Sequence, residues 1–276
     1  MNEPRLFMAS ARRSFDEQAG SFDQRAGLPA SVCDLIAKEL VQLAQLAPGD
    51  VVLEVGAGTG QIGLALCQLP LCYVGFDASA MMLDVFKRRR AKNAPPISLI
   101  ATDGNNRWPA DDGSVNAVFS SRAIHLLRVE HVVEEVFRVA SPSGATLVLG
   151  RPEREKQSLR ALLRQEMRER LWQLGYASDD GQQKEREILE ACVRRGANPL
   201  ERRVVATWPV QYSAAQILTS WREKSSLAGL ELEAEVKEKV LSQLTIWAKD
   251  VFGSLEAFQS AEEKYMLEGV RLSSKS

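Results

Sequence analysis

Short apolar runs alternate with amphipathic stretches through the first 150 residues of the chain. The stretch 129–141 places its valines at the three- and four-residue spacing of one helix face. The expected strands are 51–56, 71–77, 96–103, 114–121 and 145–150, and the expected helices are 28–46, 59–69, 79–92 and 129–141. Apolar strands that alternate with helices predict a parallel sheet covered on both faces. We therefore expect an α/β fold with a Rossmann-like, doubly wound core.

The second half of the chain is mostly helical and highly charged. Helices are expected over 154–175, 184–196, 214–230 and 233–253. Alternating patterns at 201–213 and 263–273 predict two late strands. We expect this late pair to extend the five parallel strands to a seven-stranded sheet, with the added helices forming a cover. The expected parts are an N-terminal cover segment over 1–30, a core over 31–152, and a helical elaboration carrying the last two strands over 153–276.

Composition narrows the class of protein. The 276 residues are 45% hydrophobic and 26% charged, which is typical of a globular protein. Four cysteines without a CxxC pair or zinc-finger spacing favour reduced, buried thiols. No apolar run approaches the roughly 20 residues of a membrane span, and the start MNEPRLFMASARRSFDEQ has no signal-peptide apolar region. We expect a cytoplasmic monomer or homodimer without a membrane partner.

A glycine-rich loop follows the first expected strand and reads EVGAGTG from Glu54 to Gly60. In the dinucleotide-binding fingerprint the third glycine comes three residues after the second, whereas here it comes two residues after. Glu54 would repel a pyrophosphate but would accept a hydrogen bond from an ammonium group. The loop also lacks the lysine that holds a triphosphate. A nicotinamide cofactor is therefore the weaker expectation.

Two more carboxylates end the next two strands. Asp77 stands where an acidic residue meets ribose hydroxyls. Asp103 could accept a hydrogen bond from an exocyclic amine, or it could be a turn residue. Together with Glu54 these acids suit a ligand that carries an ammonium group, a ribose and an adenine, a description that fits S-adenosylmethionine (SAM).

Several segments resemble the class I SAM-dependent methyltransferase family. VLEVGAGTGQIGLAL, VGFDASAMML, LIATDGNNRWPADDGSVNAVFSS and EEVFRVASPSGATLVLG look like its motifs in order. SFDQRAGLP resembles the N-terminal segment of a subgroup related to quinone-biosynthesis methyltransferases. The resemblance covers residues 21–150, with Phe22 where tyrosine is common and an unusual Gly-Asn-Asn after Asp103.

The resemblance implies a set of cofactor-binding residues. The glycines would let the backbone lie against the methionyl part of SAM, Asp77 would bind the ribose and Met82 would pack on the adenine, although filling the core would bury Met82 equally well. Arg25, in the cover segment, would meet the SAM carboxylate. The implied set is Arg25, Glu54, Gly56, Ala57, Gly58, Gly60, Asp77, Ala78, Met82, Asp103, Gly104, Ser120 and Ser121.

The region after the fourth strand holds the candidates for chemistry. His125 has the pKa range of a general base near neutrality, with a structural role in the loop as the alternative. Arg122 could meet an anionic substrate or lie exposed at a helix start.

Missing motifs narrow the substrate. No [DNS]-P-P-[YFW] motif follows the fourth strand, and the pI is near 6.2, so we expect no nucleic-acid substrate. No aspartate directly follows that strand either, so we expect no catalytic metal. The sequence predicts a metal-independent SAM-dependent methyltransferase that acts on a small organic molecule. The alternatives are a SAM-binding protein without transferase activity, used as a sensor or partner subunit, and a nicotinamide oxidoreductase.

Overall fold

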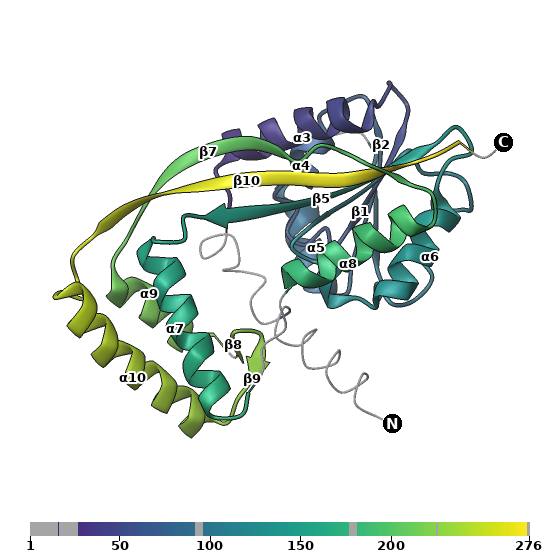
Figure 1. Cartoon of the computed structure of the whole chain (residues 1–276). Helices are drawn as coiled ribbons and strands as arrows, with labels where there is room; N and C mark the ends of the chain where they lie inside the picture. The colour runs from purple at the N-terminus through teal and green to yellow at the C-terminus, as the bar shows by residue number, and fades with distance from the viewer. Residues whose placement is uncertain (1–15, 17–26, 92–95, 177–180, 225, 275–276) are drawn as a thin grey trace. The chain divides into compact units, whose positions relative to one another are not determined.

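An eight-stranded sheet organises the chain (Figure 1). The computed structural model describes residues 16, 27–91, 96–176, 181–224 and 226–274. The strand order is β3-β2-β1-β4-β5-β10-β6, and β7 pairs with β10 outside this path. The strands are β1 Val51–Val55, β2 Cys72–Asp77, β3 Ser98–Ala101, β4 Ala117–Ser121, β5 Ala145–Arg154, β6 Asn198–Pro199, β7 Arg203–Tyr212 and β10 Gln259–Leu272.

The pairings among β1 to β5 are parallel, as the alternation of strands and helices predicts. The late strands β7 and β10 join the same sheet, which confirms the expected extension. The sheet has eight strands instead of seven because the two-residue strand β6 pairs with the end of β10.

The chain divides into two compact units. The larger unit takes the chain up to Arg151, then 181–206 and the stretch from 265 onward. The smaller unit takes 152–180 and 207–264.

Helices cover both faces of the sheet in the larger unit (Figure 1). They are α3 Ala30–Ala44, α4 Gly63–Leu66, α5 Ala80–Arg89, the 3₁₀ helix η1 Ile124–Leu126, α6 Val129–Val139 and α8 Gly181–Arg194. Side chains alternate along β1, so Leu53 and Val55 enter the apolar cluster that also holds Val132 of α6 and Ile188 of α8. Glu54, between them, faces the other side of the sheet. The expected helix over 59–69 shrinks to the four residues of α4 because turns occupy the glycine-rich stretch before it.

Three helices build the core of the smaller unit: α7 Leu159–Gln173, α9 Ala214–Arg222 and α10 Ala234–Phe252. Leu163, Trp221 and Leu241, one from each helix, belong to one buried apolar cluster. The expected helix over 214–230 was too long. It gives way to a hairpin of β8 Ser226–Leu227 and β9 Leu230–Glu231, whose two linking residues both have positive φ.

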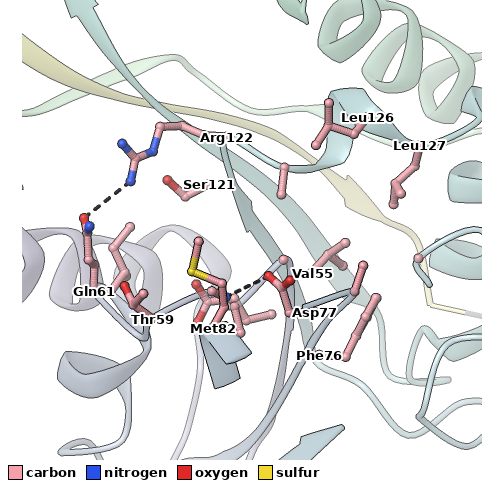
Figure 2. A pocket seen from close by; sticks show the side chains of 18 of the residues that line it. Val55, Thr59, Gln61, Phe76, Asp77, Met82, Ser121, Arg122, Leu126 and Leu127 are labelled. Carbon is pink, nitrogen blue, oxygen red and sulfur yellow. Dashed lines mark hydrogen bonds between the residues drawn. The ribbon is translucent and has the colours of Figure 1, made fainter. Parts of the chain in front are cut away.

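The carboxyl ends of β1, β2 and β4 lie side by side at one edge of the sheet. The register places Val55 of β1 beside Phe76 of β2, and Glu54 beside Phe119 of β4. The loops that follow these strands surround a cavity (Figure 2). This edge is where a doubly wound sheet is expected to bind its ligand.

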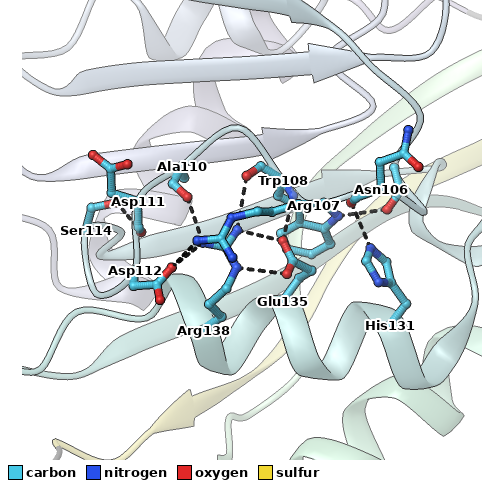
Figure 3. Close-up of polar contacts among 11 residues, drawn as sticks. Asn106, Arg107, Trp108, Ala110, Asp111, Asp112, Ser114, His131, Glu135 and Arg138 are labelled. Carbon is cyan, nitrogen blue, oxygen red and sulfur yellow. Dashed lines mark hydrogen bonds and ion pairs between the residues drawn. The ribbon is translucent and has the colours of Figure 1, made fainter.

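An ion pair on α6 fixes the loop after β3 (Figure 3). The side-chain oxygens of Glu135 accept hydrogen bonds from Trp108 N at 2.6 Å and from Arg138 Nη2 at 2.6 Å. Arg138 also donates to the carbonyl oxygens of Trp108 at 3.0 Å and Ala110 at 2.8 Å. Burial opposes ionisation of Glu135, but hydrogen bonds from Arg138 and Trp108 outweigh it and lower the pKa of Glu135. The loop that leads away from the cavity is therefore held by one guanidinium.

We expect Arg138→Ala to destabilise the protein by about 3 kcal/mol, because it leaves the Glu135 carboxylate buried without its partner. Two loop carbonyls lose their donor in the same variant. Arg138→Lys should recover only part of the loss, since an ammonium group cannot make the same forked contacts. Urea unfolding followed by circular dichroism measures these differences.

Arg107→Ala is the control, because Arg107 forms an exposed ion pair with Asp112 at 2.6 Å in the same loop. Its removal should change the unfolding midpoint little. An equal loss of unfolding free energy in Arg107→Ala and Arg138→Ala would show that the buried ion pair stabilises the protein no more than the exposed one.

Candidate functional site

A cavity at the carboxyl edge of the sheet gathers most of the residues expected to bind a cofactor (Figure 2). Ten of them line it: Glu54, Gly56, Ala57, Gly58, Asp77, Ala78, Met82, Asp103, Gly104 and Ser121. They come from the ends of β1, β2 and β4 and from the segments that follow β1, β2 and β3, at places far apart in the sequence.

The glycine loop has a backbone that disfavours larger side chains. Gly56 has a φ of 75°, and a Cβ there would come within 2.2 Å of the Ala123 Cβ. Gly58 has a φ of 54°, and its N–H donates to the Asp77 carboxylate at 2.9 Å. Glycine adopts this left-handed conformation without the clash that a Cβ causes. At Gly56 and Gly58 the backbone therefore borders the cavity without a side chain.

Asp77 connects the glycine loop to α5. Its Oδ2 accepts the Gly58 N–H, and its Oδ1 accepts the Ser79 N–H at 2.8 Å. Burial raises the pKa of Asp77; the hydrogen bonds from Ser79 and Gly58 lower it, and nearby Asp16 raises it. Asp16 itself accepts a hydrogen bond from the Ser79 hydroxyl at 2.5 Å. Asp77 is a half-buried carboxylate with a prearranged position in the cavity wall.

Glu54 is a buried acid in the wall of the same cavity. It is only 3% exposed, and its Oε2 accepts a hydrogen bond from the Tyr73 hydroxyl at 2.5 Å. Burial, which the nearby Asp77 charge supports and the Tyr73 hydrogen bond opposes, raises the pKa of Glu54 to about 8. Near neutral pH this carboxyl group is therefore largely protonated in the ligand-free protein.

Asp103 and Met82 each combine a place in the cavity wall with a structural role, a turn for Asp103 and core packing for Met82. Asp103 lines the cavity, and its Oδ1 accepts the Asn105 N–H at 2.8 Å, which is the bond of a local turn. The other carboxylate oxygen of Asp103 has no such bond among the described contacts. Met82 is 3% exposed and also lines the cavity.

Three described residues of the expected set do not line the cavity. A Cβ on Gly60 would clash with the Phe86 ring at 2.3 Å, so Gly60 allows α5 to pack closely. The buried Ser120 hydroxyl donates to the Val55 carbonyl at 2.9 Å. His125 lies against α8. Arg25, with most of the expected cover segment, lies outside the described residues.

The side chain of His125 contacts residues of α8. Its Nδ1 lies 3.8 Å from a carboxylate oxygen of Glu185, and its ring would lie 2.9 Å from a Cβ on Gly181. Both partners belong to α8, and Arg151 donates to the same Glu185 at 3.0 Å. His125 therefore joins η1 to α8.

Arg122 lines the cavity, although it was not among the cofactor-binding residues expected from the sequence. It lines the cavity and its Nη2 donates to Gln61 Oε1 at 3.4 Å (Figure 2). Arg122 has a φ of 61°, a strained conformation for a residue with a Cβ. A strained backbone at a cavity often reflects function. Periodicity could not reveal this strain, because it belongs to one residue between a strand and a turn.

An apolar wall completes the cavity with Phe76, Leu126 and Leu127. Three carboxyl groups, one guanidinium and this apolar wall therefore surround one space. The set fits SAM, which presents an ammonium group, a carboxylate, ribose hydroxyls and an adenine.

The described residues hold neither a metal-binding cluster nor a membrane-spanning helix. No group of three or more His, Cys, Asp and Glu side chains there is arranged to hold a metal ion. None of the helices in this part of the chain is long and apolar enough to cross a membrane.

Comparison with known proteins identifies the domain around the cavity. Residues 52–144 match the family model described as a methyltransferase domain. A malonyl-[acyl-carrier protein] O-methyltransferase of Marinomonas sp. is 33% identical over 135 residues, which cover 48% of this chain and 48% of that protein. A demethylmenaquinone methyltransferase of Paenarthrobacter aurescens is 29% identical over 148 residues, which cover 51% of this chain and 57% of that protein.

A solved structure shares the fold. The YcgJ protein of Bacillus subtilis aligns with 87% of this chain and 97% of its own length at a TM-score of 0.54 and 17% identity. The matched sequence segments, in contrast, span only about half the length of the two curated relatives. Residues 52–144 therefore match a methyltransferase domain, and a demethylmenaquinone methyltransferase is among the relatives of this part of the chain.

Proposed function

We propose that this protein transfers a methyl group from SAM to a small organic molecule without a metal ion. The observation that carries the proposal is the single cavity in which Glu54, Asp77 and Asp103 surround a glycine loop. Bound SAM supplies the electrophilic methyl group on its sulfonium. The protein has to bind SAM and the acceptor, orient them, and exclude water.

Each carboxyl group has a distinct proposed task. Asp77 accepts hydrogen bonds from the ribose hydroxyls, because its carboxylate is already positioned by Gly58 and Ser79. The second oxygen of Asp103 accepts from the adenine amine. Glu54 accepts from the SAM ammonium group, and this contact favours the ionised form of a carboxyl group that burial keeps protonated.

Arg122 is the proposed partner for a carboxylate. It is the guanidinium among the described residues that line the cavity, and it lies at the Gln61 side of the cavity (Figure 2). Charge-assisted, forked hydrogen bonds make arginine well suited to hold the SAM carboxylate there. Ser121, at the end of β4, then faces the methyl-transfer end of the cavity.

The acceptor lies beyond the sulfonium in this proposal. The names of the relatives suggest two acceptor classes, a malonyl group on an acyl-carrier protein and demethylmenaquinone. We assign His125 a positioning role, because it contacts α8 rather than the cavity. It holds η1, which carries Leu126 of the apolar wall.

Turnover separates the proposal from its alternative, a SAM-binding protein without transferase activity. Incubation of the protein with SAM and members of both acceptor classes should release S-adenosylhomocysteine, measured by mass spectrometry. Acceptor-dependent release that disappears in Asp77→Asn supports the transferase. Tight SAM binding with no acceptor-dependent release in either class would favour the sensor or partner subunit.

Asp77→Asn should weaken SAM binding by roughly 10- to 150-fold, because a charge-assisted acceptor contributes about 1.5–3 kcal/mol. Isothermal titration calorimetry measures the loss. Asp84→Asn is the matched control, since Asp84 lies exposed on α5 and pairs with Lys87 at 3.2 Å. Unchanged SAM affinity in a folded Asp77→Asn protein would remove Asp77 from the binding site.

SAM affinity should fall as the pH decreases below about 8, because Glu54 must be ionised to receive the ammonium group. Protonation of Glu54 with a pKa near 8 removes the binding-competent form, so the slope approaches one decade of affinity per pH unit at most. Glu54→Gln should bind SAM more weakly at pH 8 and lose this slope between pH 6 and 8. An identical slope in wild type and Glu54→Gln would assign the pH dependence to another group.

A further inference from the structure

A stripe of arginines runs along α7 in the smaller unit. Leu159, Leu163, Met167 and Leu171 face the apolar core of this unit at four-residue spacing. Arg160, Arg164 and Arg168 repeat with the same spacing one residue later, so they share the neighbouring face of the helix. They extend over two helical turns, roughly 12 Å.

Two neighbouring strands bring a fourth arginine and one carboxylate to this stripe. Arg154, at the end of β5, donates from Nε to Glu263 Oε1 of β10 at 2.8 Å. Arg160 Nη1 lies 3.8 Å from the same oxygen, and the guanidinium of Arg160 stacks 4.7 Å from the centre of the Tyr212 ring. The Tyr212 hydroxyl also donates to Glu263 at 2.8 Å. Glu263 is thus shared by three partners.

The positive charge of this group exceeds its negative charge. Four guanidinium groups and one carboxylate leave a net charge of +3. Arg164 and Arg168 form no ion pair with a described residue. Arg154 and Arg160 are largely buried, with side chains 22% and 16% exposed. Arg164 is exposed as a residue, but crowding by protein atoms around its guanidinium, together with the charges of Arg154, Arg160 and Arg168, lowers its pKa to about 10.

This arrangement is unfavourable for the protein alone. Like charges four residues apart destabilise a helix. Arg160 is the second residue of α7, where the helix dipole also disfavours a cation. An anion near the first turns of α7 would reverse both effects, since helix N-termini and guanidinium groups favour the same ligand charge.

We propose that Arg154, Arg160, Arg164 and Arg168 form a binding site for a phosphate-bearing small molecule, a phosphate ester or a diphosphate. Several guanidinium forks around a short stretch of helix match the many acceptor oxygens of one or two phosphate groups. A nucleic acid would need a longer basic surface, and the chain as a whole has a net charge of −1. The site shares no residue with the SAM cavity, whose three carboxyl groups would repel a phosphate.

Pyrophosphate is the probe for this site, and calorimetry on the full chain is the measurement. We expect saturable binding of one pyrophosphate per chain, weakened at least 10-fold in Arg164→Gln/Arg168→Gln. This variant should still fold and unfold at the same or a higher temperature without ligand, because it removes like-charge repulsion. Pyrophosphate should raise the unfolding temperature of the wild type but not of the variant.

Lys239→Gln/Lys249→Gln is the matched control, since it removes two positive charges from exposed positions of α10 in the same unit. It should bind pyrophosphate like the wild type. Asp77→Asn should also bind pyrophosphate normally, even if it loses SAM, so a failure of the SAM assignment and a failure of this site are distinguishable. Absence of saturable binding, equal weakening in the lysine control, or a preference for heparin or duplex DNA over pyrophosphate would overturn the proposal.

Discussion

The carboxylate of Asp77 joins two chain segments that reach the cavity from different strands. One oxygen accepts the Gly58 N–H after β1, and the other accepts the Ser79 N–H at the start of α5. Both bonds depend on the parallel register that places Val55 beside Phe76. The backbone of the glycine loop is therefore shaped by a side chain at the end of the next strand. In the proposed function the same carboxylate accepts hydrogen bonds from the ribose, so the fold already holds this carboxylate in position before the ligand binds.

Two buried acids of the larger unit show how the hydrogen-bond partner of a carboxyl group determines whether that group is ionised. Glu135 contacts the guanidinium of Arg138, and its pKa is lowered despite partial burial. Glu54 contacts the neutral hydroxyl of Tyr73, and burial raises its pKa to about 8. The first acid is a permanent structural anion that holds the loop after β3. The second is ready to change its charge when a cation arrives, which suits a residue in a cavity wall.

The near-neutral net charge of the chain conceals two regions of opposite sign. The cavity of the larger unit carries the carboxyl groups of Glu54, Asp77 and Asp103 with Arg122. The face of α7 in the smaller unit carries four arginines with Glu263. The cavity also has an apolar wall, which limits access of water and so strengthens electrostatic effects there. The two units therefore favour ligands of different charge.

The sequence by itself determined the core of the fold and most of the cavity. Parallel strands buried on both faces leave uninterrupted apolar runs, and glycines and acids at strand ends mark the ligand edge. These signals are local, so β1 to β5, the glycine loop and Asp77 could be predicted from neighbouring residues.

Only the tertiary structure decided which side chains near the fourth strand reach the cavity. His125 contacts Gly181 and Glu185, more than 50 residues away along the chain, while Arg122 turns into the cavity wall through a strained backbone. The meeting of Arg154 with Glu263, more than 100 residues apart along the chain, has the same origin. Periodicity reports which face of an element is apolar. It does not report the long-range packing that selects the partner of a single polar side chain.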